Sequence, residues 1–561
     1  MPAIQNPLIV QSNRSLLLEV DNPLFKEARD AIGVFAHLDK SPEYIHTYTI
    51  TPLSLWNAAA LGLQSGAVIA RLDRYSKYPL PQNITQDIAE LMDRFGKLLL
   101  ITRDGRLILE STDKDLLPNL GANSRVRTYI RQHLDAMHVE IAPEHRGIIK
   151  QVFLNLGYPI HDRAGYVDGA PFDLDLRPTY GNNKTFTIRE YQKQAAESYY
   201  GAASNEGGSG VVVLPCGSGK TIIGIYVMSL VKRRTLILVT NIVAARQWRR
   251  EILDKTTILD SDIGEYSGET KEIKPVTIAT YQILTYRKRK TAEFEHFGVF
   301  NAENWGLIIY DEVHLLPAPV FQFTANIQAR RRLGLTATLV REDGHEQDVF
   351  TLIGPKKFDV PWKDLERQGW IATARCVEIR IDLPVEDRLR FLSLEPAQQI
   401  RQAYENPLKI PVVKRLIAQH PDDRILVLGQ YITQLEEFSR SLNAPLIMGA
   451  TPNAERERLF AAFRSGEIRL LIISKVGNFA IDLPDATVAI QISGAFGSRQ
   501  EEAQRLGRIL RPKQNGSQAV FYSVVTRETR ELDFAMKRQL FLTEQGYTYE
   551  IRNVQEEPCP L

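Results

Sequence analysis

The chain has 561 residues, of which 44% are apolar and 24% charged, and this length allows three or four domains with cores of their own. Its 69 basic and 67 acidic residues leave a net charge of only +2, which excludes a polycationic protein that binds nucleic acid through its overall field. Three cysteines without metal-knuckle spacing, and aliphatic runs of strand length, indicate a cytoplasmic protein without disulfides or membrane spans.

Residues 45–110 predict three helices followed by a hairpin. Thr51 begins the first helix as its N-cap, and Asn83 is expected to cap the third. Two apolar runs on either side of the turn at 103–105 then predict paired strands. Helix, helix, helix, hairpin is the order of a winged helix, so we expect a winged-helix-like α+β module within 1–130. Such a module either docks DNA or protein, or is a structural cap.

The rest of the chain predicts two α/β domains. Residues 131–185 contain a Gly/Pro/Asp-rich passage and are expected to be a connecting region. Beyond them, short apolar strands alternate with polar helical stretches, which is typical of a parallel sheet covered on both faces. A second such series follows, so we expect domains at 186–365 and 366–545 and a tail at 546–561.

Residues 211–221, VVVLPCGSGKT, form an apolar strand that runs into a Gly-Ser-Gly-Lys-Thr turn. A glycine turn lets backbone N–H groups surround phosphate oxygens, while the lysine adds positive charge and the threonine hydroxyl can ligate Mg²⁺. A second strand ends in Asp311 and Glu312, which suit a metal ligand and a base for an attacking water. These two segments predict a nucleoside triphosphatase. The expected phosphate loop comprises Leu214, Pro215, Cys216, Gly217, Ser218, Gly219, Lys220 and Thr221, with Leu214 in place of the small residue or glycine found in many such loops.

The segment 500–513 supplies arginines at helical spacing. Gln504, Arg505, Arg508 and Arg511 recur on a common helix face. Arginines directed at a γ phosphate stabilise the charge that develops in phosphoryl transfer, and we assign this role to Arg508 and Arg511. The alternative is a basic, solvated helix face.

The order of these parts resembles superfamily 2 helicases, and whole phrases resemble the XPB family of DNA repair helicases. The phrases are REYQ at 189–192, LPCGSGKT at 214–221, TNIVAARQW at 240–248, ATYQ at 279–282, DEVH at 311–314, LGLTATLVRED at 333–343 and SRQEEAQRLGRILRPK at 498–513. They cover roughly 185–545. The segments LLLEVDNPL and HTYTITPLSLWN also resemble the N-terminal domain of the shorter bacterial-type members.

This resemblance implies two RecA-like helicase domains that use ATP and Mg²⁺. It implies that Arg189, Gln192 and Asp482 contact the nucleotide, and that Thr221 and Asp311 hold the metal. Thr336 and Thr338 would couple hydrolysis to domain movement, and Arg341, Glu342 and Asp343 correspond to the RED element used in DNA unwinding. The further DNA contacts that it implies are Arg246, Thr280, Gln430, Ser474, Lys475 and Asn478.

Three functions remain open at this point. The first is a 3′ to 5′ helicase that separates single-stranded or forked duplex DNA in repair, near the nucleoid and with a repair protein or nuclease as partner. The second is a duplex translocase that remodels protein–DNA complexes, which is favoured by the short, mixed-charge segment at 385–410 where archaeal relatives carry a basic thumb-like insertion. The third is a scaffold with vestigial hydrolysis, and the intact phosphate loop and carboxylates oppose it.

Further DNA contacts are less specific. The basic runs at 286–290 and 330–332 would neutralise phosphates, or form ordinary solvated surface. Trp248 would stack a base, or be a core aromatic residue.

Overall fold

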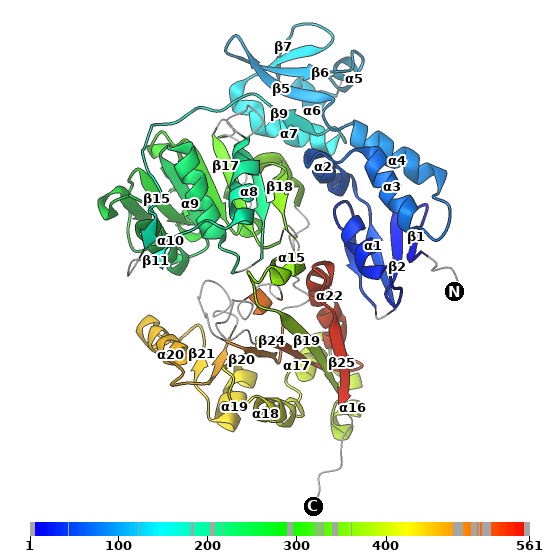
Figure 1. Cartoon of the computed structure of the whole chain (residues 1–561), viewed down its shortest axis with the longest axis vertical. Helices are drawn as coiled ribbons and strands as arrows, with labels where there is room; N and C mark the ends of the chain where they lie inside the picture. The colour runs from blue at the N-terminus through cyan, green and yellow to red at the C-terminus, as the bar shows by residue number, and fades with distance from the viewer. Residues whose placement is uncertain are drawn as a thin grey trace, which may run out of the picture. The chain divides into compact units, whose positions relative to one another are not determined.

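The computed structural model describes residues 6–42, 44–121, 123–180, 184–201, 208–215, 217–288, 295–317, 319–320, 324, 327, 330–338, 346–360, 362–474, 486–494, 502, 505–507 and 518–554. The chain divides into two compact units (Figure 1). Unit 1 contains residues 1–37, 44–214 and 219–359, and unit 2 contains 38–43, 215–218 and 360–561.

The expected three helices and hairpin are present in unit 1. Thr51 Oγ1 accepts a hydrogen bond from the Ser54 backbone N–H, which caps the first helix. Asn83 is not a cap, because the third helix already begins at Gln82, and the Asn83 amide donates to the Ser12 carbonyl instead. The elements are α2 (Pro52–Ala60), α3 (Ser65–Tyr75), α4 (Gln82–Asp93), β5 (Leu98–Arg103) and β6 (Arg106–Ser111). The winged-helix assignment itself stays a prediction.

A small antiparallel sheet precedes these helices. In it β2 pairs with both β1 and β4. The elements before α2 are β1 (Leu8–Val10), β2 (Ser15–Glu19), α1 (Phe25–Ile32), β3 (His37–Lys40) and β4 (Ile45–Thr49). Within the described residues no single helix is long and apolar enough to cross a membrane; α2 and α3 reach that length only when taken together across a 115° bend.

The segment expected to connect the domains is folded rather than extended. Its strands join the β5–β6 hairpin in a five-stranded sheet of order β7-β8-β6-β5-β9, with α7 packed in the same core. Leu100 of the hairpin and Ile149 of α7 are both fully buried there. The added elements are α5 (Leu116–Gly121), α6 (Ser124–Arg127), β7 (Ile130–His133), β8 (His138–Ile141), α7 (Arg146–Asn155) and β9 (Ile160–Asp162).

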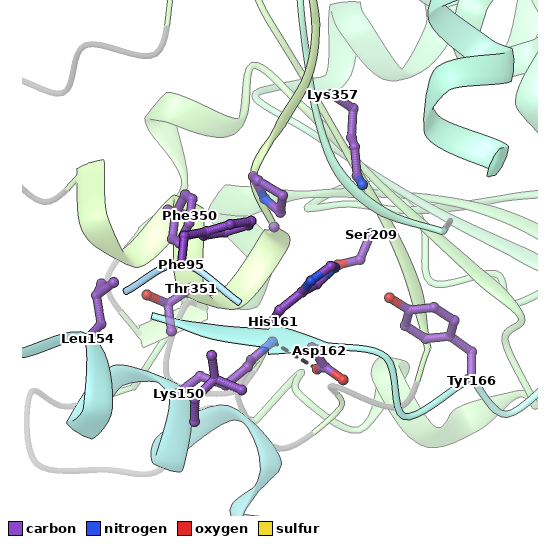
Figure 2. Close-up of a pocket in the computed structure, with 13 residues that line it drawn as sticks. Phe95, Lys150, Leu154, His161, Asp162, Tyr166, Ser209, Phe350, Thr351 and Lys357 are labelled. Carbon is purple, nitrogen blue, oxygen red and sulfur yellow. Dashed lines mark hydrogen bonds and ion pairs between the residues drawn. The ribbon is translucent and has the colours of Figure 1, made fainter. Parts of the chain in front are cut away.

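Asp162, the last residue of β9, is the centre of a buried cluster of charged side chains. Asp162 accepts two hydrogen bonds from Arg146, at 2.8 and 3.0 Å, and one from Lys150 at 3.1 Å. Figure 2 shows the Lys150 ammonium pointing at this carboxylate, beside Tyr166 and Ser209. The Tyr166 ring lies 5.3 Å from the Arg146 guanidinium and 5.8 Å from that of Arg332 on the next sheet. The cluster therefore joins the five-stranded sheet to the larger sheet of unit 1.

The larger sheet of unit 1 has seven parallel strands, in the order β14-β15-β13-β16-β17-β12-β18. Figure 1 shows α8, α9 and α10 beside it. Its strands are β12 (Ser209–Val213), β13 (Thr235–Val239), β14 (Ile263–Tyr266), β15 (Val276–Thr280), β16 (Leu307–Asp311), β17 (Arg331–Thr336) and β18 (Lys356–Asp359). The helical elements include α8 (Glu190–Tyr200), α9 (Lys220–Val231), α10 (Ile242–Lys255), α11 (Tyr281–Leu284), α12 (Val299–Ala302) and the π-helix η5 (Val349–Ile353).

Unit 2 contains a second seven-stranded parallel sheet, in the order β21-β22-β20-β23-β24-β19-β25. Its strands are β19 (Ala374–Ile381), β20 (Ile425–Leu428), β21 (Leu446–Ile447), β22 (Leu470–Ile473), β23 (Val488–Gln491), β24 (Ala519–Thr526) and β25 (Tyr549–Val554). Its helices are α15 (Trp362–Arg367), α16 (Val385–Leu392), α17 (Pro396–Tyr404), α18 (Lys409–Gln419), α19 (Ile432–Leu442), α20 (Asn453–Ser465) and α22 (Arg530–Glu544). The predicted pair of parallel-sheet domains is confirmed. The expected tail differs from the structure, because β25 is the edge strand of this sheet.

Candidate active site

The phosphate loop connects β12 to α9. Gly217 and Gly219 have φ values of 81° and 82°, a region that favours glycine. A methyl group on Gly219 would lie 2.5 Å from the Gln192 side-chain nitrogen, so a larger residue there would have to displace the Gln192 amide. Ser218 is buried and donates to the Pro215 carbonyl at 2.7 Å, which closes the turn.

Lys220 is the first residue of α9 and is almost fully buried. Its ammonium nitrogen lies 3.6 Å from Glu312 Oε1 and 3.4 Å from the Leu214 carbonyl oxygen. The lysine therefore joins the phosphate loop to the carboxylates at the end of β16. Thr221 follows it at the start of the helix, partly exposed.

Asp311 ends β16, and both of its carboxylate oxygens are held by donors. Oδ1 accepts the Glu312 backbone N–H at 3.1 Å, and Oδ2 accepts the Trp248 indole N–H at 2.8 Å. Burial, and then the neighbouring Glu312 charge, raise the pKa of Asp311 to about 6, although the Trp248 hydrogen bond opposes this. Each oxygen retains a lone pair that could face a cation.

Glu312 has a left-handed backbone, with φ 49° and ψ 53°, which is unusual for a residue with a side chain. Burial alone would raise its pKa, but the charges of Lys220 and then His314 lower it, so the carboxylate is the stable form. Its Oε2 is buried, accepts no hydrogen bond within the described part of the chain, and lies 3.5 Å from His314 Nδ1. The strained turn thus directs a charged carboxylate with one available acceptor back toward the phosphate loop.

His314 connects this turn to β17. Its Nδ1 lies 2.5 Å from Thr336 Oγ1. Thr336 Oγ1 in turn donates to the Thr338 carbonyl and accepts the Thr338 N–H at 3.1 Å. Thr338 Oγ1 is buried and has no hydrogen-bond partner among the described residues. The DEVH and LTAT segments are therefore hydrogen-bonded to each other.

These residues fit a nucleoside triphosphate with Mg²⁺. The glycine cradle exposes N–H groups, Lys220 supplies a cation, and Asp311 offers the oxygen ligands that Mg²⁺ prefers. Glu312 Oε2, lacking a hydrogen-bond donor in the described chain, is placed to accept one from water.

Three family models match the chain: "ERCC3/RAD25/XPB C-terminal helicase" over 365–558, "Type III restriction enzyme, res subunit" over 185–341 and "Helicase conserved C-terminal domain" over 8–135. The protein named "DNA 3′-5′ helicase XPB" of Mycobacterium tuberculosis is 51% identical over 98% of both chains. The chain belongs to the XPB family. The protein of the same name from Kineococcus radiotolerans is also 51% identical, over 97% of this chain and 96% of its own length. The "General transcription and DNA repair factor IIH helicase/translocase subunit XPB" of Antonospora locustae is 34% identical, over 97% and 81%.

Of the two predicted adenine contacts, Gln192 is buried, and its side-chain oxygen accepts the Arg189 backbone N–H at 3.1 Å. The Arg189 guanidinium donates to the Tyr191 hydroxyl at 3.1 Å. The two predicted contacts thus lie together at the start of α8, and Gln192 also adjoins the phosphate loop at Gly219.

The predicted DNA contacts have different surroundings. Arg246 is about half exposed and pairs with Glu269 at 2.8 Å. Thr280 is buried, and its hydroxyl oxygen caps α11. In unit 2, the Gln430 N–H donates to the Ser493 hydroxyl, and the buried Ser474 Oγ has no hydrogen-bond partner in the described chain. The remaining predicted site residues, Cys216, Arg341, Glu342, Asp343, Lys475, Asn478, Asp482, Arg508 and Arg511, lie outside the described residues.

The structure decides between the two alternatives for Trp248 and corrects the expected surface positions of Arg332 and Arg505. Trp248 is 1% exposed and cannot stack a base, because its ring is packed in the core. Arg332 of the basic run is fully buried and donates to Leu352 O and Ser209 Oγ, so it neutralises no phosphate. Arg505 is buried and bonds Gln491 and the Ser493 carbonyl, so it does not lie on a face presented to phosphate.

Trp248, Tyr281 and His314 lie beside the two carboxylates, and the sequence did not predict this. Tyr281 donates its hydroxyl to the Asp311 backbone carbonyl at 2.8 Å. Each of the three stands inside a phrase shared with the family. The His314 contact with Glu312 is local, but 63 residues separate Trp248 from Asp311 and 30 separate Tyr281 from it. Spacing alone could not reveal the contacts of Trp248 and Tyr281.

Proposed function

We propose that this XPB-family chain is an ATP-dependent DNA helicase that moves 3′ to 5′ and separates DNA strands in repair. The observation that carries the proposal is the cluster of Lys220, Asp311 and Glu312, in which a buried lysine lies 3.6 Å from a strained carboxylate at the end of β16. The 51% identity to a protein named "DNA 3′-5′ helicase XPB" over the whole chain supports the substrate and the polarity.

In this proposal the chain's own residues divide the work of hydrolysis. Glu312, a carboxylate with one free acceptor, orients the attacking water and takes its proton. Lys220 and the loop N–H groups hold the phosphates, and Thr221 and Asp311 hold Mg²⁺, which when bound neutralises phosphate charge. Arg508 and Arg511 stabilise the γ phosphate from the second domain.

The DNA side of the proposal rests on exposed residues of unit 1. Arg246 is half exposed on α10 and suited to a phosphate contact. We further propose that the RED residues at 341–343 support unwinding and that the protein works on single-stranded or forked DNA at the nucleoid in the cytoplasm. We further propose that a repair protein or nuclease acts on the opened DNA.

ATP turnover without polymer and with single-stranded DNA, duplex DNA or RNA tests the proposed substrate. We expect stimulation by DNA well above that by RNA. Equal stimulation by RNA would contradict the assignment to DNA.

A duplex translocase is the second candidate, and α16 favours it. This helix lies in the segment where the resemblance places a basic insertion in archaeal relatives, yet it exposes Val385, Leu389 and Leu392 and has two acidic residues in its first turn. Such a face offers little grip on a strand backbone. Turnover stimulated by duplex DNA without strand separation would select this candidate.

A further inference from the structure

Two aromatic side chains fix Asp311 from opposite ends of the residue. The Trp248 indole N–H donates to the carboxylate oxygen Oδ2, and the Tyr281 hydroxyl donates to the backbone carbonyl, both at 2.8 Å. Both side chains are buried, at 1% and 4% exposure. The first bond orients the predicted metal ligand, and the second orients the peptide that leads into Glu312.

Gly224 makes the Trp248 contact possible. It lies inside α9, where glycine costs about 1 kcal/mol relative to alanine. A methyl group there would lie 2.5 Å from the Trp248 ring. The missing side chain at Gly224 therefore leaves space on α9 for the Trp248 indole. This space lets the ring lie against α9 while its N–H bonds Asp311 at the end of β16.

The two aromatic residues belong to the two segments predicted to contact DNA. Trp248 lies in α10, two residues after Arg246, whose guanidinium is half exposed. Tyr281 begins α11 directly after Thr280, which caps that helix. In each segment a residue that touches Asp311 thus lies within two positions of a residue predicted to contact DNA.

We propose that Trp248 and Tyr281 are positioning residues that link occupancy of the DNA-side helices α10 and α11 to the geometry of Asp311 and Glu312. This inference rests on the proposed function: it states that DNA bound at α10 and α11 controls ATP hydrolysis. A shift of α10 when DNA binds moves the donor on the metal carboxylate. A shift of α11 turns the peptide that sets the direction of the Glu312 side chain.

The alternative is that Trp248 and Tyr281 only stabilise the fold. Both would then affect stability alone, as any buried aromatic residue does. Matched controls in the same unit separate the two cases. Trp305 is fully buried and donates its indole N–H to the Val299 carbonyl at 2.9 Å, and Tyr199 is fully buried and donates its hydroxyl to the Gly208 carbonyl at 3.0 Å.

The first experiment measures metal use without turnover. A mant-labelled, non-hydrolysable ATP analogue is titrated at increasing Mg²⁺ against the full-length wild type, Trp248→Phe and Trp305→Phe. Loss of a residue that orients a metal ligand typically lowers metal affinity by about 10- to 100-fold. We expect the Mg²⁺ concentration at half-maximal binding to rise by that factor in Trp248→Phe only; the same shift in both variants, or in neither, overturns the inference.

The second experiment measures the dependence of turnover on DNA. Tyr281→Phe should lower the maximal DNA-stimulated rate roughly tenfold, as expected for one lost hydrogen bond, without changing the KM for ATP, whereas Tyr199→Phe should change neither. A change in KM alone, or equal effects in both variants, contradicts the assigned role of Tyr281.

A double-mutant cycle tests whether Trp248 acts on the DNA signal. Arg246→Ala and Trp248→Phe are compared singly and together for the ratio of turnover with and without DNA. We expect the double variant to lose no more stimulation than Arg246→Ala alone, and fully multiplicative losses would overturn the link. If the wild type shows no DNA stimulation, the proposed function fails, while the Mg²⁺ titration still decides whether Trp248 positions Asp311.

Discussion

The Lys220 ammonium lies 3.6 Å from the Glu312 carboxylate, and this pair joins the phosphate loop to the strained end of β16. Lys220 lowers the pKa of Glu312 against the effect of burial and so keeps the proposed base ionised. Glu312→Gln should reduce ATP turnover by roughly 10²- to 10⁴-fold, because a positioned proton acceptor is lost. Nucleotide binding should persist. Turnover at the parent rate would refute the assigned base, and Glu251→Gln, whose side chain pairs with Lys255 on α10, is the control.

The contact between His314 and Thr336 predicts that the LTAT strand senses the catalytic turn. Thr336→Val removes a hydroxyl that bonds both His314 and Thr338 while nearly preserving the side-chain volume. We expect DNA-stimulated turnover to continue and strand separation to fall at least tenfold. Thr351→Val also removes a buried hydroxyl that donates to a backbone carbonyl, and it should leave both activities unchanged. Equal losses of turnover and separation in Thr336→Val would count against a coupling role.

The buried cluster at Asp162 predicts an asymmetry between its members. Asp162 holds Arg146 and Lys150 together, and burial, followed by the charges of Arg332 and Arg146, lowers the pKa of Lys150 to about 8 despite its bond to Asp162. Asp162→Asn should destabilise the fold by about 3–5 kcal/mol, because buried cations lose their counter-charge. Lys150→Met should cost less than about 1 kcal/mol, since Arg146 still pairs with Asp162. Urea unfolding of both variants tests this, and equal destabilisation would contradict it.

His46 predicts a pH dependence of the N-terminal module. Burial, and then the charge of Arg29, lower the pKa of His46 to about 4, whereas an unfolded histidine titrates near 6.5. The unfolded state therefore takes up a proton first as the pH falls. Stability is fully present above pH 6.5 and is lost by up to about 3 kcal/mol as the pH falls toward 4.

Hydrogen exchange of the β4 segment at several pH values measures this loss locally. His46→Leu should flatten the dependence between pH 6.5 and 4. Replacement of the exposed His133 by Leu should leave it unchanged. A dependence that is the same in all three proteins would show that His46 does not cause it.

The central strands of both large sheets could be predicted from the sequence because they are apolar on both faces. The runs at 235–239 and 307–310, for example, are buried throughout. The strands that escaped prediction have polar positions. β18 (Lys356–Asp359) and β25 (Tyr549–Val554) are edge strands with mixed burial. β19 contains the fully buried Glu378, whose Oε1 accepts from Arg380 and whose Oε2 accepts from Gln539, 161 residues away. No local pattern encodes the Gln539 partner.

The active site likewise has a part that could be predicted from the sequence and a part that could not. The glycine loop and the two carboxylates were predicted because their chemistry depends on adjacent residues. The side chains around those groups were not predicted, because Trp248 and Tyr281 contact Asp311 from α10 and α11, which are distant in sequence. The expected surface positions of Arg332 and Arg505 were wrong, and the choice between a stacking and a core role for Trp248 stayed open, because residue type alone does not reveal that a large side chain is buried.

Strand separation on tailed duplexes tests the central claim most directly. The full-length protein is mixed with Mg²⁺ and ATP and with DNA duplexes that carry a single-stranded tail at either the 3′ or the 5′ end, and Glu312→Gln serves as the inactive control. The account predicts ATP-dependent separation of the 3′-tailed duplex and little separation of the 5′-tailed one. DNA-stimulated ATP turnover without separation of either duplex would contradict it.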